Sequence, residues 1–167
     1  MTSLHSTNQR VVEAAATAGV EIEVRRFPES TKTSAEAAAA AGCPLSAIAK
    51  SLVFVCQGTD SDEPVIAVLS GDHRLDTSKL AVAAGAIGSR RAELDEVRSA
   101  TGYAPGGTAV FGLANRLRIF ADNGLRRNDP IWSAAGTPDA IYPISLDDFD
   151  RAVKPIWTDL AAVPPEA

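Results

Sequence analysis

Apolar residues near the start of the chain recur at helical spacing. Val11, Ala15 and Ala18 fall on one face of a helix, and Gly19 ends it. Ser6 stands where this helix would begin, and its hydroxyl can accept a hydrogen bond from a free N–H of the first turn. We therefore predict a helix that Ser6 caps and that runs to about residue 18.

Capping residues and breakers predict further helices. Thr33 and Glu36 have the spacing of a capping box, in which each side chain bonds the backbone of the other residue. Asp76 is a second capping residue, and Gly42 and Gly85 end the two helices. The helices predicted after the first lie at about 33–42, 45–49, 77–84, 93–100 and 147–153.

Shorter runs that alternate, or that are rich in β-branched residues, predict strands. Two of them, 51–57 and 64–70, flank the polar segment 58–63 and form a predicted hairpin. Because helices and strands do not alternate regularly, the predicted class is α+β, a mixed β-sheet with flanking helices. The other predicted strands lie at about 22–26, 117–121, 131–134 and 141–144.

Composition places these elements in one domain. The 167 residues fit a single domain, predicted over 1–167 with its core at about 27–153 and a loose tail at about 155–167. Hydrophobic residues make up 46% of the chain, enough for a core without metal or disulfide. Cys43 and Cys56 have no metal-ligand spacing and are interpreted as reduced thiols. No apolar run could span a membrane and no signal peptide begins the chain, so we expect a cytoplasmic protein.

The charge balance limits the kind of partner. The net charge is −5 and the isoelectric point is about 5.0, which counts against tight nucleic-acid binding over a large footprint. Local basic spots remain and leave a small contact open, although a solvated surface pair is the simpler interpretation of each. They are Arg90-Arg91, Arg116 with Arg118, and Arg126-Arg127.

Motifs of several enzyme classes are missing from the sequence. It has no G-x-S-x-G nucleophile elbow, no Walker A motif and no dinucleotide fingerprint. His73 stands beside Asp72 and is interpreted as a turn residue; a triad would require a serine next to it in a cleft. The sequence therefore predicts neither a metal nor a cofactor.

Two features suggest a binding site. Lys50 stands where the predicted short helix meets an apolar strand. Its stem can pack on the core while its ammonium reaches water, or the ammonium can point into a cleft and hold a phosphate or carbonyl oxygen. The segment 102–112 contains four glycines, whose backbone a ligand can approach closely.

Several motifs resemble the YbaK/EbsC family, the editing domains associated with prolyl-tRNA synthetase. They occur in the family's order over about residues 27–153, which implies that family's editing-domain fold. The matching segments are Thr33–Ala38, Ile48–Phe54, Val68–Asp72, Asp76–Leu80, Thr101–Tyr103, Gly106-Gly107, Phe111-Gly112 and Ile131–Gly136.

The resemblance implies an activity and a partner. Family members hydrolyse the ester that joins a wrongly attached small amino acid, typically alanine or cysteine, to the 3′ adenosine of a tRNA. It thus implies a trans-editing deacylase that contacts the tRNA acceptor end, with tRNA(Pro) expected and a synthetase as a further candidate partner. An aminoacyl ester is already activated, so such a site mainly orients it, polarises its carbonyl and admits water.

The resemblance also implies site residues. The family lysine matches Lys50, which is expected to be the catalytic residue and to hold the substrate near its terminal nucleotide. The glycine-rich loop matches Gly106-Gly107, whose backbone would bind the aminoacyl ester and limit its size. The other substrate-binding positions expected are Phe27, Ser51, Ser133 and Gly136.

One departure from the family pattern leaves two hypotheses open. Family members often carry G-G-x-P-P-F-G in the glycine loop, whereas Ala109 and Val110 replace the prolines here. Proline restricts the backbone before a ligand binds, so its loss predicts a looser or reshaped loop unless the glycines and Phe111 preserve the shape. The alternative to a deacylase is a non-catalytic member that binds a nucleotide-like ligand or regulates a partner protein.

Overall fold

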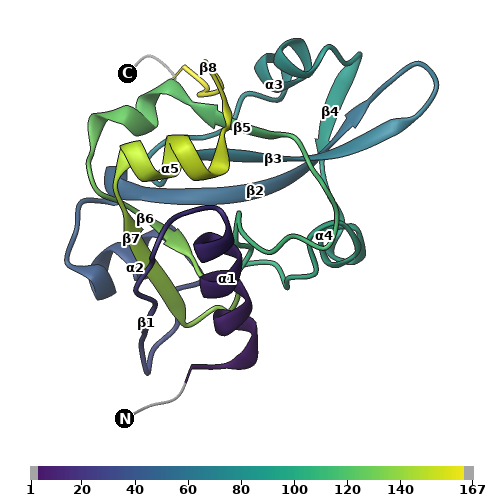
Figure 1. The fold of residues 1–167 in the computed structure, drawn as a ribbon. Helices are drawn as coiled ribbons and strands as arrows, with labels where there is room; N and C mark the ends of the chain where they lie inside the picture. The colour runs from purple at the N-terminus through teal and green to yellow at the C-terminus, as the bar shows by residue number, and fades with distance from the viewer. Residues whose placement is uncertain (1–3, 164–167) are drawn as a thin grey trace.

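The computed structural model describes residues 4–163, which form five α-helices around one mixed sheet (Figure 1). The helices are α1 (Ser6–Thr17), α2 (Ser34–Ala41), α3 (Thr77–Ala84), α4 (Leu94–Thr101) and α5 (Leu146–Val153), with short 3-10 helices η1 (Leu45–Ala47) and η2 (Asn123–Arg127). The strands are β1 (Arg25–Arg26), β2 (Ile48–Gln57), β3 (Asp62–Ser70), β4 (Gly88–Arg91), β5 (Ile119–Asp122), β6 (Ile131–Ala134), β7 (Ala140–Ile144) and β8 (Ile156–Thr158).

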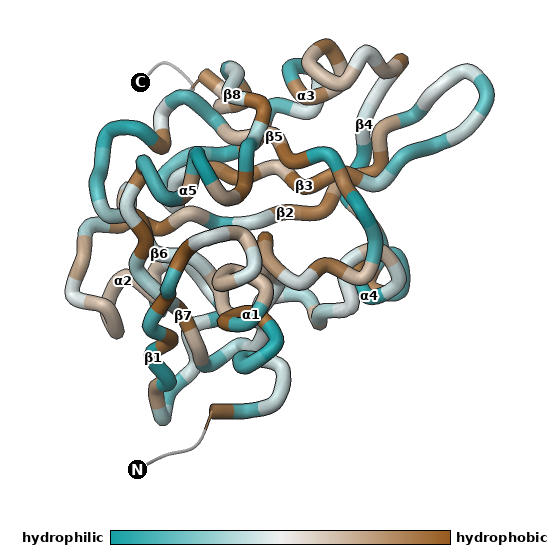
Figure 2. Tube along the Cα trace, viewed as in Figure 1, coloured by the Kyte–Doolittle hydropathy of each residue, from teal (hydrophilic) through white to brown (hydrophobic). Residues whose placement is uncertain are grey.

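The strand order is β1-β7-β6-β2-β3-β5-β8, with β4 paired to β2 outside this path. The β2–β3 pair is antiparallel, whereas β2–β6 and β3–β5 are parallel. This confirms the predicted α+β class with a mixed sheet and flanking helices. The central strands are mostly hydrophobic, and the tip of the β2–β3 hairpin is hydrophilic (Figure 2).

Helices cover both faces of the sheet. Val11 of α1, Val97 of α4 and Phe149 of α5 belong to the main core on one face. On the other face, Leu80 of α3 packs with β2, β3 and β5, and α2 packs on Ile48 of β2. Because side chains alternate along a strand, consecutive residues of β2 point to different faces and contribute to different cores.

Local capping explains why the predicted helices form where they do. The Thr33 hydroxyl accepts from the Glu36 N–H at 3.1 Å and the Glu36 carboxylate accepts from the Thr33 N–H at 3.2 Å, so the predicted capping box is confirmed. The Asp76 carboxylate accepts from two N–H groups at the start of α3, as predicted. At α1 the prediction is wrong, because the imidazole of His5 is the capping group and Ser6 is the first helical residue.

The strands differ more from prediction. The run predicted at 22–26 pairs with β7 only at Arg25 and Arg26. β2 begins at Ile48, three residues early, so Lys50 lies inside the strand instead of preceding it. β4 was not predicted, because Gly-Ser-Arg-Arg has no apolar alternation and is held by pairing with β2.

The tail predicted to be loose from about residue 155 is partly ordered, which corrects that boundary. β8 pairs with β5, and Trp157 makes an edge contact with Phe149 at 6.0 Å between ring centroids. Leu160 is fully buried, and Ala161 forms a bridge with Leu75. Tertiary burial rather than local propensity fixes this segment, and only its last residues, 164–167, lie outside the described part of the chain.

One side of β2 is interrupted, and this interruption positions the site. Ile48 and Ala49 pair with β6, and Phe54 to Gln57 pair with β4, so residues 50–53 have no strand partner on that side. The Val53 carbonyl accepts there from the Ala92 N–H at 3.1 Å. Backbone direction alternates along a strand, so the N–H and C=O of Ser51 also face this gap.

Candidate functional site

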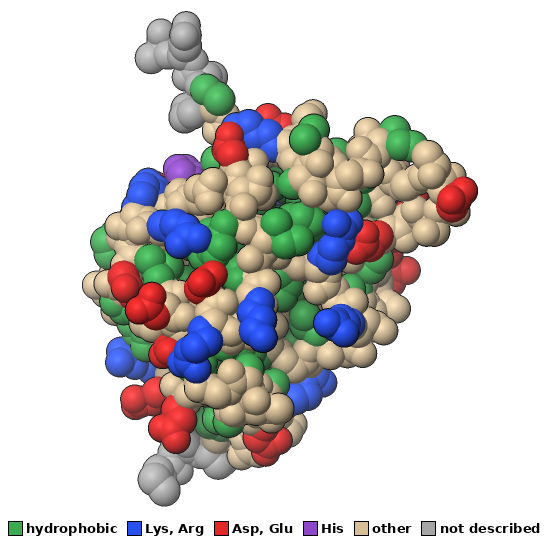
Figure 3. Space-filling model, turned by 45° about the horizontal axis from the view of Figure 1, so that its top comes forward, with side chains coloured by type: hydrophobic (Ala, Val, Ile, Leu, Met, Phe, Trp, Pro, Cys, Tyr) green, Lys and Arg blue, Asp and Glu red, His purple; other side chains and the backbone are tan. Residues whose placement is uncertain are grey.

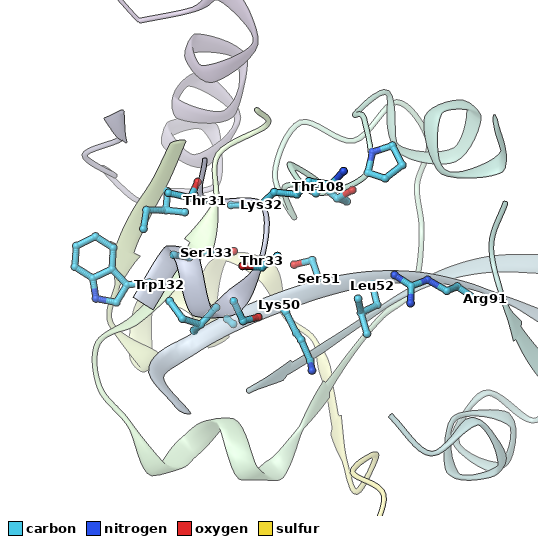
Figure 4. Close-up of a pocket in the computed structure, with 18 of the residues that line it drawn as sticks. Thr31, Lys32, Thr33, Lys50, Ser51, Leu52, Arg91, Thr108, Trp132 and Ser133 are labelled. Atoms are coloured by element: carbon cyan, nitrogen blue, oxygen red, sulfur yellow. The ribbon is translucent and has the colours of Figure 1, made fainter. Parts of the chain in front are cut away.

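A pocket with a cavity volume of about 420 Å³ opens at the gap in β2 (Figure 4). Four parts of the chain supply most of its lining: the segment before α2 and its first turns, the first half of β2, the glycine-rich loop and β6; β4, α4 and β7 add one residue each. Its volume lies in the lower part of the range for small-molecule sites. The described residues that line it are Thr31, Lys32, Thr33, Ser34, Ala37, Ile48, Ala49, Lys50, Ser51, Leu52, Arg91, Leu94, Pro105, Gly106, Thr108, Trp132, Ser133, Ala134 and Ile141.

Lys50 reaches this pocket from the central strand. Its side chain lies on the opposite face of β2 from that of Ser51, and in Figure 4 the two point in different directions. The Lys50 Nζ donates to the backbone carbonyl of His73. Burial lowers the pKa of Lys50; Asp72 opposes this change, and Arg74 and Arg91 add to it. The ammonium is therefore partly desolvated, and within residues 4–163 it forms no ion pair with a carboxylate.

Hydroxyl groups line the other side of the gap. Ala49 pairs with Ser133, and Ser51 follows two residues along β2 on the same face. The Oγ atoms of both serines are buried and have no hydrogen-bond partner among the described residues. Ser133 faces Tyr142 across the β6–β7 pair, and burial raises the pKa of the Tyr142 phenol. Buried hydroxyls without partners are uncommon, and a bound ligand would satisfy that of Ser51, whereas the Ser133 hydroxyl has the Tyr142 hydroxyl beside it.

The glycine-rich loop forms the wall opposite β2. Gly106 lines the pocket at φ +89°, and a Cβ there would meet the Lys32 side chain at 2.5 Å. Gly107 lies behind it, where a Cβ would come within 2.8 Å of the Thr137 backbone. Only glycine fits both positions without a shift of the loop or its neighbours.

A buried hydroxyl and core packing hold the loop at the positions where the family carries prolines. The Tyr103 hydroxyl donates to the Phe111 carbonyl at 2.6 Å and lies 3.3 Å from the Gly112 carbonyl. Ala109 and Val110, which stand in place of the prolines, are buried in the main core and do not line the pocket. The substitutions thus fill the core behind the loop, and the added bulk of Val110 does not narrow the site.

The charged residues that line the pocket are all basic, although the net charge of the chain is negative. Lys32, Lys50 and Arg91 are among the lining residues, and none of the described lining residues is Asp, Glu or His. The face drawn in Figure 3 has basic and acidic side chains interspersed, without one broad basic surface. The pocket therefore suits a ligand that carries local negative charge or carbonyl oxygens, held over a small footprint.

His73 lies outside the pocket and is oriented by an acid. Its Nδ1 is 3.4 Å from Oδ2 of the buried Asp122, which also accepts from the Gly124 N–H. The other Asp122 oxygen accepts from the N–H groups of Leu160 and Ala161. Within residues 4–163 the His73 ring makes no hydrogen bond to a serine, so the condition for a triad is not met.

The structure brings four of the predicted site residues to the pocket: Lys50, Ser51, Gly106 and Ser133. It places the other three outside it. Phe27 lines a separate hollow beside Pro28, Gly107 backs the loop, and a Cβ at Gly136 would meet Thr7 of α1 at 2.8 Å. These three support the walls, and a direct contact with substrate stays a prediction.

Sequence reasoning missed Lys32, Thr108 and Arg91. A signal existed for two of them, since Lys32 precedes the capping box and Thr108 follows the double glycine. Arg91 belongs to a basic pair that was interpreted as a solvated surface. Its place in the pocket depends on the unpredicted strand β4.

The described residues contain neither a cluster of metal-binding side chains nor a helix that could span a membrane. Residues 4–163 contain no group of three or more His, Cys, Asp or Glu side chains placed to hold a metal ion. Of the helices that the structure describes, none is both long and apolar enough to cross a bilayer.

The chain is similar to known proteins over most of its length. The family model of the aminoacyl-tRNA editing domain matches residues 28–152. The chain is 32% identical over 143 residues to the uncharacterized protein YwhH of Bacillus subtilis, covering 84% of this chain and 87% of that protein. It is 29% identical over 150 residues to the multifunctional Ser/Thr-tRNA deacylase ProXp-y of Escherichia coli K12, covering 89% of each. It also resembles the crystal structure of a candidate trans-editing enzyme for prolyl tRNA synthetase, with a TM-score of 0.87, 33% identity and coverage of 96% of this chain and 100% of that one.

Proposed function

The chain belongs to the aminoacyl-tRNA editing domain family, and from this premise we propose that it hydrolyses the ester between a small amino acid and the 3′ end of a tRNA. The predicted resemblance to the YbaK family is thereby confirmed at the level of family and fold. The activity of this particular chain, its amino acid and its tRNA are the substance of the proposal.

One observation supports the proposal most strongly. At the gap in β2, unpaired backbone, buried hydroxyls without partners and three cations meet around one cavity that no described carboxylate lines. The aminoacylated 3′ end of a tRNA offers the complementary groups: a carbonyl and an amino group for the backbone and hydroxyls, and backbone phosphates for the cations. Such concentrations of unsatisfied polar groups are typical of sites that are completed by a ligand.

The chemistry requires few side chains. In our proposal the acyl group enters the Ser51 side of the gap, and the backbone of Gly106 and Ser51 orients and polarises the ester carbonyl. Water adds to that carbonyl carbon, the bond to the ribose oxygen breaks, and the oxygen takes up a proton. The products are the free amino acid and the tRNA 3′-hydroxyl. Because no described Asp, Glu or His lines the pocket, a neighbouring ribose hydroxyl or the substrate's own side chain would assist proton transfer.

Lys50 has a defined role in this arrangement. Its ammonium lies on the face of β2 away from Ser51, so it is suited to the nucleotide rather than the acyl carbonyl. Holding the terminal nucleotide there would place the ester at the gap in the strand. The expected catalytic contribution of Lys50 is therefore one of positioning.

Amino-acid specificity is the finer part of the proposal. The family resemblance implies alanine or cysteine on tRNA(Pro), whereas the E. coli relative is named as a Ser/Thr-tRNA deacylase. A pocket of about 420 Å³ with two buried serine hydroxyls is suited to small residues of either kind. We propose a cytoplasmic site of action and a prolyl-tRNA synthetase as the associated enzyme, the latter from the likeness to its trans-editing relatives.

A deacylation assay tests the proposal. The native chain, Lys50→Ala and Lys79→Ala are compared on tRNA(Pro) and other tRNAs carrying alanine, cysteine, serine or threonine. Lys79 is the matched control, because it lies outside the pocket and its ammonium bonds Asp159. We expect the native chain and Lys79→Ala to release at least one of these amino acids and Lys50→Ala to be at least about tenfold slower. No release by the native chain from any substrate would overturn the proposal.

The alternative, a member that binds without hydrolysis, has one observation in its favour. None of the described residues that line the pocket can serve as an ordinary general base at neutral pH. Binding of a non-hydrolysable aminoacyl-adenosine without turnover of any mischarged tRNA would support it. Turnover would exclude it.

A further inference from the structure

Arg91 is a charged group at the pocket to which neither the sequence nor the family match gives a role. We propose that Arg91 is a positioning residue that binds a backbone phosphate of the 3′-terminal nucleotides of the tRNA. This inference rests on the proposed function, since it assigns the part of the same substrate that Arg91 recognises.

The register of β4 sets the direction of Arg91. Arg91 pairs with Phe54 across the antiparallel β2–β4 ladder, and cross-strand partners project from the same face. Leu52 and Lys50 follow at two-residue intervals and share that face. Figure 4 shows the Arg91 guanidinium extending along β2 toward Leu52. Arg91 and Lys50 therefore lie on the same side of the strand, on either side of Leu52, with Cα atoms separated by about 13 Å along the strand direction.

The adjacent residue, Arg90, shows what an arginine of purely structural role does in this strand. It makes two parallel hydrogen bonds to Glu96, at 2.8 and 2.9 Å, and points away from the pocket. Arg91 is exposed and has no carboxylate within salt-bridge distance among the described residues. Two neighbours of identical chemistry thus differ in whether a carboxylate of this chain neutralises them.

The surroundings of Arg91 favour an anion. None of the described pocket-lining residues is acidic, and the positive charge of Arg91 acts unfavourably on Lys50, whose pKa it helps to lower. A bound phosphate would remove that repulsion and would replace the missing carboxylate. The planar guanidinium presents several donors to phosphate oxygens and is weakly hydrated, so it suits this ligand better than a second lysine would.

The acidic net charge strengthens the assignment to a short segment of nucleic acid. Five of the twelve arginines pair with a carboxylate of the chain: Arg90 and four further surface arginines, Arg26, Arg118, Arg127 and Arg151. Long stretches of RNA backbone would meet the carboxylates of these pairs. One or two phosphates next to the terminal nucleotide can instead be held by Arg91 and Lys50 without approaching them.

The experiment compares Arg91→Gln with Arg90→Gln in steady-state deacylation of a mischarged tRNA at several salt concentrations. We expect Arg91→Gln to raise KM about fivefold, to leave kcat within about twofold, and to reduce the slope of log KM against log salt by about one, as the loss of one phosphate contact predicts. Arg91→Lys should recover part of the loss. Arg90→Gln should change neither KM nor the slope.

Two further measurements separate this inference from the proposed function. With an aminoacyl-adenosine that has no phosphate, native and Arg91→Gln should react alike; a defect there would overturn the phosphate assignment. If the native chain deacylates no tRNA, the proposed function fails, and Arg91 is then tested by anisotropy with a labelled CCA trinucleotide. Weaker binding by Arg91→Gln than by Arg90→Gln would still support the phosphate contact. Equal effects of the two substitutions in either assay, or an unchanged salt slope, would refute it.

Discussion

The pocket and the surface around it use charge in opposite ways. On the surface, arginines such as Arg118 and Arg127 donate two hydrogen bonds each to a carboxylate of the same chain. In the pocket, Arg91 and Lys32 have no such partner among the described residues, and Lys50 donates only to a backbone carbonyl. The change occurs between the adjacent residues Arg90 and Arg91. Three cations line the pocket and none of the described lining residues is acidic, so a ligand with local negative charge is expected there.

The largest effect should come from the loop that forms the uncharged wall. Gly107→Ala places a Cβ within 2.8 to 2.9 Å of three atoms of Thr137. These are backbone atoms, so no side-chain rotation can relieve the clash. The loop must shift, and a displacement of about 1 Å at a reacting centre can cost roughly 100-fold in rate. Deacylation kinetics of the variant measure this loss.

Gly42→Ala is the control for that loss, because Gly42 lies at φ +72° but a Cβ added there would have nothing within 4 Å. It should cost about 1 kcal/mol of stability from backbone strain and leave the rate unchanged. Equal activities of the two variants would show that the close approach of the loop to Thr137 does not shape the site.

A smaller effect is expected from the group that holds the loop. Tyr103→Phe removes the buried hydroxyl that donates to the Phe111 carbonyl. We expect the free energy of unfolding to fall by about 1–2 kcal/mol and KM to rise, because the loop loses a buried hydrogen bond that restrains it. Urea denaturation measures the first effect. Unchanged stability together with unchanged KM would mean that core packing of Val110 and Phe111 alone fixes the loop.

The charge of the pocket can be measured through Lys50. Burial lowers its pKa below the ordinary value of 10.5, so its ammonium should lose its proton at lower pH than an exposed lysine does. Arg91→Gln removes one of the positive charges that act on Lys50 and should move the titration upward. Carbon-13 NMR of the lysine Cε atoms, with Lys50→Met for assignment, follows both. A midpoint for Lys50 at or above 10.5 in the native chain would contradict the desolvated pocket cation.

The smallest effect is expected from removing the charge of Glu96, which pairs with Arg90 at the surface. Hydrogen bonds from Arg90 and from the Glu93 N–H lower the pKa of Glu96 from 4.5 to about 2. The native charge of Glu96 therefore contributes to stability above about pH 4.5, and this contribution is lost as the pH falls toward 2. Glu96→Gln should unfold slightly more easily than the native chain at pH 7 and equally at about pH 2. If the two proteins still differ in their free energy of unfolding at about pH 2, the substitution acts through packing and not through the charge of Glu96.

Local features were predictable from the sequence because their causes are local. The capping box of Thr33 and Glu36 and the cap at Asp76 act over three residues, and both form as predicted. β4 and β8 were missed because they exist only through pairing with distant strands. The same holds within the site. Lys50 could be matched through its motif. Arg91 could not be told apart from Arg90, because only the structure shows that Glu96 pairs with Arg90 and leaves Arg91 without a carboxylate among the described residues.

The gap in β2 is where the ester is proposed to bind, and a complex with a non-hydrolysable analogue shows whether it does. The analogue is an adenosine with alanine or serine attached through a 3′-amide, and its position is found by crystallography. We expect the acyl carbonyl within hydrogen-bond distance of the backbone at Ser51 or Gly106, with the adenosine on the Lys50 side of β2. An analogue bound elsewhere, for example in the hollow beside Phe27, with the gap in β2 left free, would contradict this binding mode.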